Sequence, residues 1–275
     1  MVRPVKVRQV WQYNLKHEFS LIYQVLPRFP YASMDTEFPG VIYHDPVFHY
    51  SALSATQTYS IMKKNVDAMK LIQFGLTLSD AEGNLPDFGT PYCYVWEFNF
   101  REFDVDKDLQ NPDSIALLKR QGIDFSKNKK IGICSFHFAT LFMASGLSMA
   151  PTWVNQNRTW VTFHSTYDFG FLVKILSLQN LPNDLSRFLE LTRMYFGINV
   201  FDMKQIMLFH QVHGGLERVA KSLNVERMAG KSHQAGSDSL LMMQTFMQLK
   251  KIYFNGPRKE LLNKFNYMLH GLATN

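Results

Sequence analysis

The hydrophobic and polar positions of the chain follow two periods, one typical of helices and one typical of strands. Apolar residues three and four positions apart predict an amphipathic helix over residues 10–26, which ends at Pro27. A stretch of apolar and small residues, FPYASM at residues 29–34, predicts a buried strand that continues to Glu37. A helix followed by a buried strand is therefore the expected start of the fold.

More strands are expected further along the chain. The segments 65–80 and 92–100 are rich in apolar residues, and the pair Gly83–Asn84 between them is a typical turn sequence. These two segments are therefore predicted to form an antiparallel hairpin. The segment TWVTFHS at residues 159–165 predicts another short buried strand.

Helical periodicity returns in several later segments. The expected helices cover residues 112–123, 136–147, 167 onward, 181–196, 214–225 and 236–254, and residues 198–208 carry both strand and helix signals. Helices interleaved with strands are typical of a mixed sheet, so the fold class is predicted as α/β. No linker, low-complexity tract or internal repeat divides the chain, which favours one domain over residues 1–275.

Net charge and cysteine content exclude only a few classes of function. The net charge of +6 permits nucleic-acid binding without requiring it. Basic residues gather within the first 16 residues and in a second group, for which a solvated surface is the simpler interpretation: Arg218, Lys221, Arg227 and Lys231. The two cysteines, Cys93 and Cys134, are too few for a thiol-based zinc site or a disulfide framework, and they favour a reduced intracellular compartment.

The sequence predicts neither a signal peptide nor a membrane span. The basic N-terminus, MVRPVKVRQVW, has no apolar centre. Residues 131–157 carry no formal charge, but serines, a histidine, Thr140 and Pro151 interrupt their apolar residues. Because no run of about 18 apolar residues exists, a buried helix is expected there, in a soluble protein without a membrane partner.

The most informative motif lies at the end of the buried strand, in MDTEFPG at residues 34–40. Asp35 and Glu37 are two residues apart, so in a strand their side chains point to the same face. Two carboxylates that lie so close repel each other and raise each other's pKa. Such a pair is expected to persist only where a positive charge lies between its members.

Two more acidic residues share this setting, since Asp168 and Asp238 each open a predicted helix just after a strand or loop. Capping of the helix N-terminus is the simpler interpretation of each one alone. Together with Asp35 and Glu37, however, they offer the hard oxygen ligands that Mg²⁺ or Mn²⁺ prefers. A pair of such ions roughly 4 Å apart activates water and stabilises the leaving oxygen of a phosphodiester. His233, five residues before Asp238, is a candidate general base because imidazole titrates near neutral pH.

The segments that carry these residues resemble a known family. MDTEFPG, FHSTYDFGFLVKIL and HQAGSDSLLM are similar to the three motifs of the DEDD exonuclease superfamily, and the histidine five residues before the last acid is similar to its DEDDh subclass. Eight blocks, among them VWQYNLKHEF, NVDAMKLIQFGLTLSD, WEFNF and GGLERVA, run in the order found in the Caf/Pop-type deadenylase, the nuclease subunit of the Ccr–Not complex. The resemblance covers nearly the whole chain.

This resemblance implies a ribonuclease-H-like fold, a mixed sheet flanked by helices, and 3′→5′ removal of the mRNA poly(A) tail with release of 5′-AMP. It implies His233 as the general base and two divalent cations, Mg²⁺ or Mn²⁺, held by four ligands: Asp35, Glu37, Asp168 and Asp238. Phe38 stands where such enzymes line the terminal nucleotide, although a core position is an equal alternative.

The resemblance also implies partners and a place of action. The expected partners are poly(A) RNA, a Not-type scaffold subunit and a second nuclease subunit of the Ccr–Not complex, with no nucleotide cofactor. The expected role is mRNA turnover and control of gene expression, in both cytoplasm and nucleus. The alternatives are a scaffold or transcription-regulatory subunit with a vestigial nuclease site, and a DEDDh exonuclease that acts on other RNA or on single-stranded DNA.

Two positions depart from the family motif. Thr166 stands where the family has glycine, and Phe171 stands where it has tyrosine. Thr166 lies two residues before Asp168, so its branched side chain would alter metal geometry or RNA access. Every catalytic position of the motifs is nevertheless filled, which favours an active enzyme.

Two weaker patterns are not expected to be functional sites. His210 and His213 have the spacing of some metal ligands, but no thiol or motif accompanies them. His164, Ser165 and Asp168 contain the residue types of a hydrolase triad, but residues adjacent in sequence rarely form one.

Overall fold

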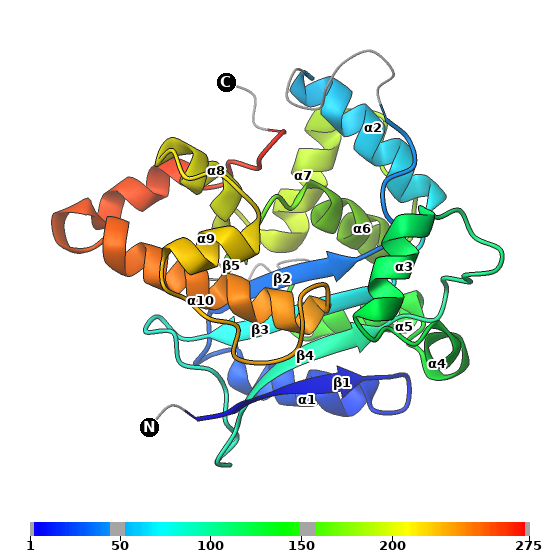
Figure 1. Ribbon diagram of the computed structural model, residues 1–275, viewed down its shortest axis with the longest axis horizontal. Coiled ribbons are helices and arrows are strands. Elements are labelled where there is room, and N and C mark those ends of the chain that lie inside the picture. The colour runs from blue at the N-terminus through cyan, green and yellow to red at the C-terminus, as the bar shows by residue number, and fades with distance from the viewer. Residues whose placement is uncertain (1–2, 45–52, 149–157, 273–275) are drawn as a thin grey trace.

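A six-stranded sheet runs through the computed structural model, which describes residues 3–44, 53–148 and 158–272 (Figure 1). Within these ranges the strand order is β1-β4-β3-β2-β5-β6. The strands are β1 (Val5–Val10), β2 (Tyr31–Glu37), β3 (Gln73–Ser79), β4 (Cys93–Asn99), β5 (Thr159–Thr162) and β6 (Val200–Asp202). Strand β2 pairs antiparallel with β3 and parallel with β5, so the sheet is mixed as predicted.

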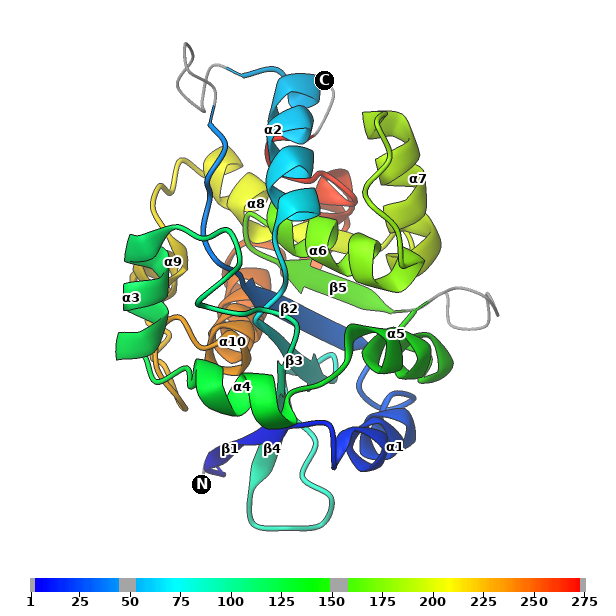
Figure 2. The same cartoon turned by 90° about the vertical axis from the view of Figure 1, so that its right-hand side faces the viewer.

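Helices cover both faces of this sheet (Figure 2). They are α1 (Leu15–Val25), α2 (Ala55–Ala68), α3 (Pro112–Arg120), α4 (Phe125–Ile131), α5 (Ser135–Ala144), α6 (Thr166–Ser177), α7 (Leu185–Phe196), α8 (Met203–Phe209), α9 (Leu216–Ser222), α10 (Ala235–Tyr253) and the 3-10 helix η2 (Gly256–Phe265). Helix α10 packs along β2 and β3 on one face, whereas α1, α5 and α6 cover the other. The predicted fold class, an α/β fold with a mixed sheet flanked by helices, is confirmed.

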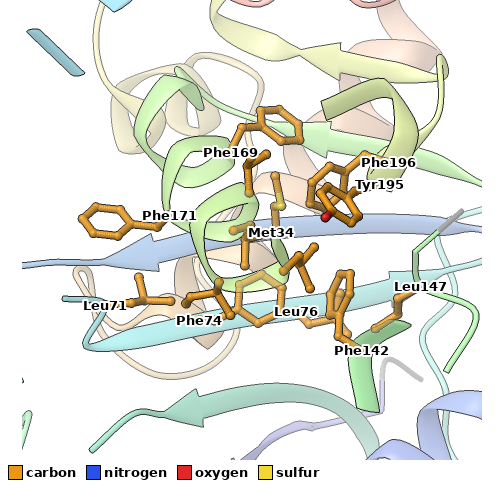
Figure 3. Close-up of a cluster of buried hydrophobic side chains, with 14 of the residues drawn as sticks. Met34, Leu71, Phe74, Leu76, Phe142, Leu147, Phe169, Phe171, Tyr195 and Phe196 are labelled. Atoms are coloured by element: carbon orange, nitrogen blue, oxygen red, sulfur yellow. The ribbon is translucent and has the colours of Figure 1, made fainter. Parts of the chain in front are cut away.

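The largest hydrophobic core lies between the sheet and α6. Figure 3 shows side chains from strands and helices in one cluster, among them Met34, Phe142 and Phe169. The ring of Phe142 lies edge-on to Phe74 with 6.2 Å between centroids, and Phe169 lies edge-on to Phe196 at 5.1 Å. This packing fixes α6 on the sheet, so that the first turn of α6 is held at a defined place beside β2.

On the opposite face, the N-terminus of α10 lies directly on β3 at Gly75. A Cβ atom at Gly75 would lie 1.8 Å from the carbonyl oxygen of Ala235, so only glycine permits this approach. Gly75 is also the residue that pairs with Asp35 in the β2–β3 register. The close contact therefore brings the first turn of α10 beside Asp35.

The N-terminal prediction needs correction. Residues 5–10 form the edge strand β1, and the helix predicted over residues 10–26 begins only at Leu15. Val10 is buried as the last residue of β1 and pairs with Phe98 of β4. It therefore belongs to the sheet and is not part of the helix. Tertiary pairing with β4 decides the conformation here, because a short apolar run is compatible with either element.

Other elements were expected in part. Strands β3 and β4 form the predicted antiparallel pair, and Gly83 takes the left-handed conformation of a turn, with φ of +95°. Residues 65–68, predicted to open a strand, instead end α2, and neither α2 nor α4 was expected. The predicted helix within residues 131–157 is α5, while residues 149–157 lie outside the described part of the chain.

Cys93 and Cys134 are both free thiols, as predicted. Among the described residues, no helix combines the length and the apolar character that crossing a membrane requires.

Candidate active site

Strand β2 presents Asp35 and Glu37 at its carboxyl end, as predicted. Glu37 is buried and Asp35 is half-buried. Their spacing of two residues puts both carboxylates on one face of the strand. Because β2 lies between β3 and β5, segments that follow or pack on either neighbour can reach this end of the strand.

Helix α6 brings Asp168 to the same end of β2. Strand β5 ends at Thr162 and a short turn leads into α6, whose first turn contains Asp168. The hydroxyl of Thr36 donates a hydrogen bond to Asp168, with 2.6 Å between Oγ1 and Oδ1. Asp168 therefore touches the residue that lies between Asp35 and Glu37 in the strand.

Helix α10 brings Asp238 from the opposite face of the sheet. Arg227 donates from Nη2 to Asp238 Oδ1 at 2.5 Å, and the backbone N–H of His233 donates to Oδ2 at 2.8 Å. His233 adopts a left-handed conformation, with φ of +59°, in the loop before α10. Both oxygens of the Asp238 carboxylate are therefore oriented by the loop that also carries the predicted base.

The helix-capping interpretation of the two helical acids is wrong. Ser165 is the N-cap of α6 and Gln234 is the N-cap of α10. Asp168 and Asp238 each lie inside the first helical turn, three to four residues after the cap. Their side chains bond to Thr36, Arg227 and the His233 backbone in other segments, so tertiary contacts and not capping account for their placement.

A cavity of about 450 Å³ lies at this end of β2. Asp168 is not among the residues that line it, but the hydroxyl that Asp168 binds belongs to Thr36, which does. The polar lining of the cavity includes Asp35, Glu37, Asp238 and His233, and its apolar lining comes from Phe38, Phe163, Leu216 and Met242. A cavity of this size, with acids on one part of its wall and apolar side chains on another, suits a ligand with a charged end and a flat apolar end.

The carboxylates within the site are not evenly spaced. One ligating atom from each of Glu37, His233 and Asp238 lies within 4.8 Å of the other two, a spacing that fits a single metal ion. Asp35 and Asp168 fall outside this closest group, although burial and, after it, the negative charge of Asp168 raise the pKa of Asp35. Among the described residues, the closest set of ligating atoms is therefore the one around Asp238.

Crowding raises the pKa values of the acids on β2. Burial raises the pKa of Asp35 well above its ordinary value of 3.8, and the negative charges of Asp168, Asp238 and Glu37 add to the effect, whereas Arg227 lowers it. Burial likewise raises the pKa of Glu37 well above 4.5, with further contributions from Asp238 and Asp168. The charge of Glu37 thus raises the pKa of Asp35, as the sequence motif predicted, while burial is the larger cause for both acids.

The two helical acids differ in their environments. Burial raises the pKa of Asp168 to about 7, although the hydrogen bond from Thr36 opposes the rise. Burial also raises the pKa of Asp238, but here the positive charge of Arg227 opposes the rise, together with its hydrogen bond. A different neighbour therefore opposes the rise in pKa at each acid, Thr36 for Asp168 and Arg227 for Asp238.

The donor set fits hard divalent cations. Neighbouring carboxylates raise the pKa values of Asp35 and Glu37, and cations that lie between the acids would relieve this repulsion. Carboxylate oxygens are the ligands that Mg²⁺ and Mn²⁺ prefer. A thiol ligand is absent from the lining of the cavity, so the donors do not match a structural zinc site. The residues present thus match the metal class expected from the sequence.

Arg227 and Glu97 are parts of the site that sequence reasoning missed. Arg227 belongs to the basic group interpreted as a solvated surface, yet it binds Asp238 and also donates to Glu217, which lines the cavity, at 2.6 Å. Glu97 on β4 is buried and accepts a hydrogen bond from the Gly236 backbone at 3.0 Å. No local signal distinguishes either residue from an ordinary charge, because the partner of Glu97 lies 139 positions away and the partners of Arg227 lie in the helices on either side of its loop.

Phe38 packs against other aromatic rings and also lines the cavity. Contact of Phe38 with a terminal nucleotide stays a prediction. The Phe38 ring stacks on Tyr167 with 5.1 Å between centroids and lies at the same distance from Phe171. Phe171, the departure from the family tyrosine, is buried and supports Phe38 by this ring contact. The departure at Thr166 is also buried, and its hydroxyl donates to the His270 carbonyl at 2.9 Å.

In the described part of the chain, neither weaker sequence pattern coincides with a group placed to hold a metal or with a hydrolase triad. Among the described residues, the one group placed to hold a metal contains neither His210 nor His213, and the His210 ring stacks on Tyr253 at 4.3 Å. The hydroxyl of Ser165 lies 3.4 Å from the carboxylate of Asp202, which does not match a triad with its sequence neighbours.

Comparison with known proteins identifies the family. The model of the CAF1 family ribonuclease matches residues 10–143. The "Probable CCR4-associated factor 1 homolog 7" of Arabidopsis thaliana is 46% identical over 272 residues, which cover 98% of this chain and 94% of that protein. The "Poly(A) ribonuclease pop2" of Schizosaccharomyces pombe is 40% identical over 270 residues, which cover 98% of this chain and 75% of that protein.

Solved structures agree. The structure of S. pombe Pop2p in its Mg²⁺ and Mn²⁺ bound form has a TM-score of 0.86 at 38% identity, covering 97% of this chain and 99% of that one. The structure of the yeast NOT1 MIF4G domain co-crystallized with CAF1 matches with a TM-score of 0.77 at 33% identity, covering 96% of each chain. Exonuclease I, at 13% identity and a TM-score of 0.54, over 85% of this chain and 42% of its own, shares the fold alone.

These matches confirm the predicted ribonuclease-H-like fold, the resemblance to Caf/Pop-type deadenylases and the prediction of an exoribonuclease. The chain belongs to the CAF1 family of ribonucleases.

Proposed function

We propose that the chain is a 3′→5′ poly(A)-specific exoribonuclease that shortens mRNA tails and releases 5′-AMP by two-metal-ion hydrolysis. The observation that carries the proposal is the convergence of acids from β2 and α10 on one cavity beside a histidine, with Asp168 of α6 hydrogen-bonded to the lining residue Thr36. Burial raises the pKa values of these acids. A relative at 40% identity bears the name poly(A) ribonuclease, which supports the choice of substrate.

Asp35, Glu37, Asp168 and Asp238 would hold two divalent cations, Mg²⁺ or Mn²⁺. When bound, such cations stabilise negative charge on the phosphodiester and make water a better nucleophile. The solved structure of Pop2p in its Mg²⁺ and Mn²⁺ bound form supports this choice of metals.

Other side chains of the cavity are assigned to proton transfer and to binding of the terminal base. His233 accepts the proton of the attacking water, because its ring lines the cavity next to Glu37 and Asp238. Phe38 and Leu216 provide apolar surface against which the terminal base can stack. Because the cavity encloses about 450 Å³, it has room for one terminal nucleotide, which fits removal of one residue at a time from a free end.

A 5′-labelled oligo(A) incubated with the protein and Mg²⁺ or Mn²⁺ tests the activity. A ladder that shortens from the 3′ end is expected for the wild type and no ladder for Asp35→Ala. Asp106→Ala, which removes an exposed carboxylate on a loop outside the cavity, is the matched control and should behave as the wild type. Intact RNA under every metal condition would overturn the proposal and favour a scaffold or regulatory subunit with a vestigial site.

Substrate preference needs a separate comparison. Oligo(A), oligo(U) and oligo(dA) of equal length are expected to be degraded in that order, with oligo(A) at least tenfold ahead. Equal rates on all three would instead indicate a DEDDh exonuclease with a broader range of RNA or single-stranded DNA substrates.

His233→Asn separates the base from the ligands. We expect the variant to lose about 10² to 10⁴-fold in rate, the usual contribution of a general base, while Mn²⁺ affinity stays within about threefold of the wild type. A large loss of Mn²⁺ affinity would assign His233 to the metal shell, as its distance to Glu37 and Asp238 allows.

Partners follow from the relatives. We propose membership of a Ccr–Not complex, with a Not-type scaffold subunit and a second nuclease subunit as partners. The proteins matched at 33% and 46% identity carry the names CAF1, in a crystal with the NOT1 MIF4G domain, and CCR4-associated factor 1 homolog 7. Co-elution of this chain with a Not-type MIF4G domain in size-exclusion chromatography is expected, and separate elution at micromolar concentrations would contradict the proposal.

A further inference from the structure

The C-terminal segment, residues 266–272, lies against the turn that leads into α6. The hydroxyl of Thr166, the first residue of α6, donates to the carbonyl of His270 at 2.9 Å. Thr166 is fully buried, so this hydrogen bond is shielded from water and its loss would leave the carbonyl without that donor. The bond joins the helix that carries Asp168 to a segment about 100 residues later.

The same turn is held by the carboxylate of Asp202, the last residue of β6. Asp202 is fully buried and accepts from the backbone N–H groups of His164 at 2.8 Å and Ser165 at 3.4 Å. It also accepts from the backbone N–H of His270 at 3.1 Å. One carboxylate therefore connects the turn before α6 with the C-terminal segment.

These contacts hold a turn that is unfavourable by itself. His164 has φ of +58°, a left-handed conformation that residues with a side chain rarely adopt. The hydrogen bond from its own N–H to Asp202 stabilises this conformation. Its ring also lies edge-on to the ring of His270 with 4.8 Å between centroids, so side-chain and backbone contacts act at the same place.

The C-terminal segment is itself fixed, so it can serve as a support. Leu269 and Leu272 are buried in the main core. The Tyr267 backbone N–H donates to the Val200 carbonyl at 2.7 Å, and its hydroxyl donates to the Leu189 carbonyl at 2.7 Å. The segment thus contacts β6 and α7 independently of the turn before α6.

We propose that Thr166 and Asp202 are positioning residues that hold the first turn of α6, through the C-terminal segment, at the place where Asp168 meets a metal ion. Neither side chain is among those that line the cavity, and Asp168 itself contacts the lining through Thr36, so each residue acts by placing Asp168. Small displacements of a ligand weaken a metal site, because the ligand geometry must be held within about half an ångström. The inference rests on the proposed role of Asp168 as a metal ligand.

Mn²⁺ titration followed by electron paramagnetic resonance tests the inference in the absence of RNA. Thr166→Val keeps the branched shape and removes the hydroxyl, and we expect about tenfold weaker Mn²⁺ binding, a usual effect of losing a group that orients a metal ligand. Thr166→Ser keeps the hydroxyl and should bind Mn²⁺ within about twofold of the wild type. With saturating Mn²⁺, Thr166→Val should lower kcat and leave KM for oligo(A) unchanged.

Thr245→Val is the matched control. Thr245 is also fully buried, and its hydroxyl donates to a helix carbonyl, that of Leu241 in α10, at 2.6 Å. This substitution removes the same kind of hydrogen bond without touching α6. We expect a lower melting temperature with unchanged Mn²⁺ affinity, the pattern that a purely structural threonine gives.

The inference is overturned if Thr166→Val binds Mn²⁺ as tightly as the wild type. Asp202→Asn gives a second measurement should Thr166→Val fail to fold. A single amide oxygen cannot accept all the bonds of the carboxylate, so Mn²⁺ binding should weaken at least as much, and unchanged binding counts equally against the inference. Asp168→Ala separates this outcome from failure of the proposed function. If Asp168→Ala also leaves Mn²⁺ binding unchanged, the metal site itself is wrong.

Discussion

The helices α6 and α10 bring one acid each to the site, and they support these acids by different means. Asp168 on α6 accepts a hydrogen bond from the neutral hydroxyl of Thr36. Asp238 on α10 accepts from the cationic Arg227 and from the backbone N–H of His233. The charge of Asp238 is therefore compensated within the protein, whereas the charge of Asp168 is not.

The difference indicates how the site is prepared for metal. Repulsion among four carboxylates would disorder the site if none were compensated, and Arg227 lowers the pKa of both Asp35 and Asp238. The α10 side is thus organised before a cation binds. The α6 side relies on its packing and on the turn held by Asp202, and a bound cation is expected to stabilise it more.

The largest effect is expected when either helical acid is removed. We predict that Asp168→Asn and Asp238→Asn each lower kcat/KM on oligo(A) by about a thousandfold or more, because both remove a charge that holds the cations. The loss corresponds to about 4 kcal/mol of transition-state stabilisation. A variant that keeps more than a tenth of wild-type activity would show that its acid is not a metal ligand.

The pH dependence of stability should distinguish the two helices next. Burial raises the pKa of Asp168 from an ordinary value of 3.8 to about 7, so in this window the folded protein binds a proton that the unfolded chain has lost. Without divalent cations, stability should therefore be greatest near pH 4 and fall as the pH rises to about 7, by on the order of 4 kcal/mol from this group.

Urea unfolding in EDTA across this pH range measures the effect. Asp168→Asn should remove this group's share of the dependence, since its amide does not titrate, while the raised pKa values of Asp35 and Glu37 keep part of it in place. Asp238→Asn should reduce the dependence less, because Arg227 already opposes the rise in the pKa of Asp238. A larger effect of Asp238→Asn would contradict the assigned difference between the helices.

Metal binding should stabilise the wild type more than a variant of the β2 acids. At a Mn²⁺ concentration about 100 times the dissociation constant, linkage predicts about 2.7 kcal/mol of stabilisation, visible as a higher melting temperature. Asp35→Ala should be at least as heat-stable as the wild type in EDTA, because repulsion is relieved, and should gain much less from Mn²⁺. Equal gains in the two proteins would argue against ligation by Asp35.

The smallest effects concern the supporting side chains. Arg227→Gln and Thr36→Val should each weaken Mn²⁺ binding roughly tenfold, because each leaves one helical acid without its donor. Conservative substitutions distinguish support by the charge of Arg227 from support by the hydroxyl of Thr36. Arg227→Lys should restore part of the loss by charge, and Thr36→Ser should restore nearly all of it by its hydroxyl. Full activity of Arg227→Gln would remove the assigned role of Arg227.

Local sequence patterns predicted most of the elements, and the exceptions have physical causes. The alternating Val5–Val10 segment is a strand only because β4 pairs with it, and its last apolar residue coincides with the start of a helical stripe. Helix α2 is largely polar, which hides its periodicity. Ser54 and Gln57 nevertheless form a capping box at its start, and Tyr59 and Met62 are buried at helical spacing, so the sequence does contain signals of a helix here.

The candidate site divides in the same way. The acids and His233 belong to short motifs, so a metal-binding and catalytic role could be predicted for them before their positions were known: Asp35, Glu37, Asp168, His233 and Asp238. Their supports were not visible. Thr36 and Asp168 are 132 positions apart in the sequence, and Asp202 and His164, in the turn before α6, are 38 apart. Only the tertiary fold brings these residues into contact.

Anomalous diffraction from a crystal soaked in Mn²⁺ and AMP locates the metal ions and their ligands. We expect two Mn²⁺ peaks between the ends of β2, α6 and α10, within coordination distance of oxygens from four acids: Asp35, Glu37, Asp168 and Asp238. A single peak bound by His233 and Glu37, with Asp35 and Asp168 turned away from it, would contradict a site built from four acids.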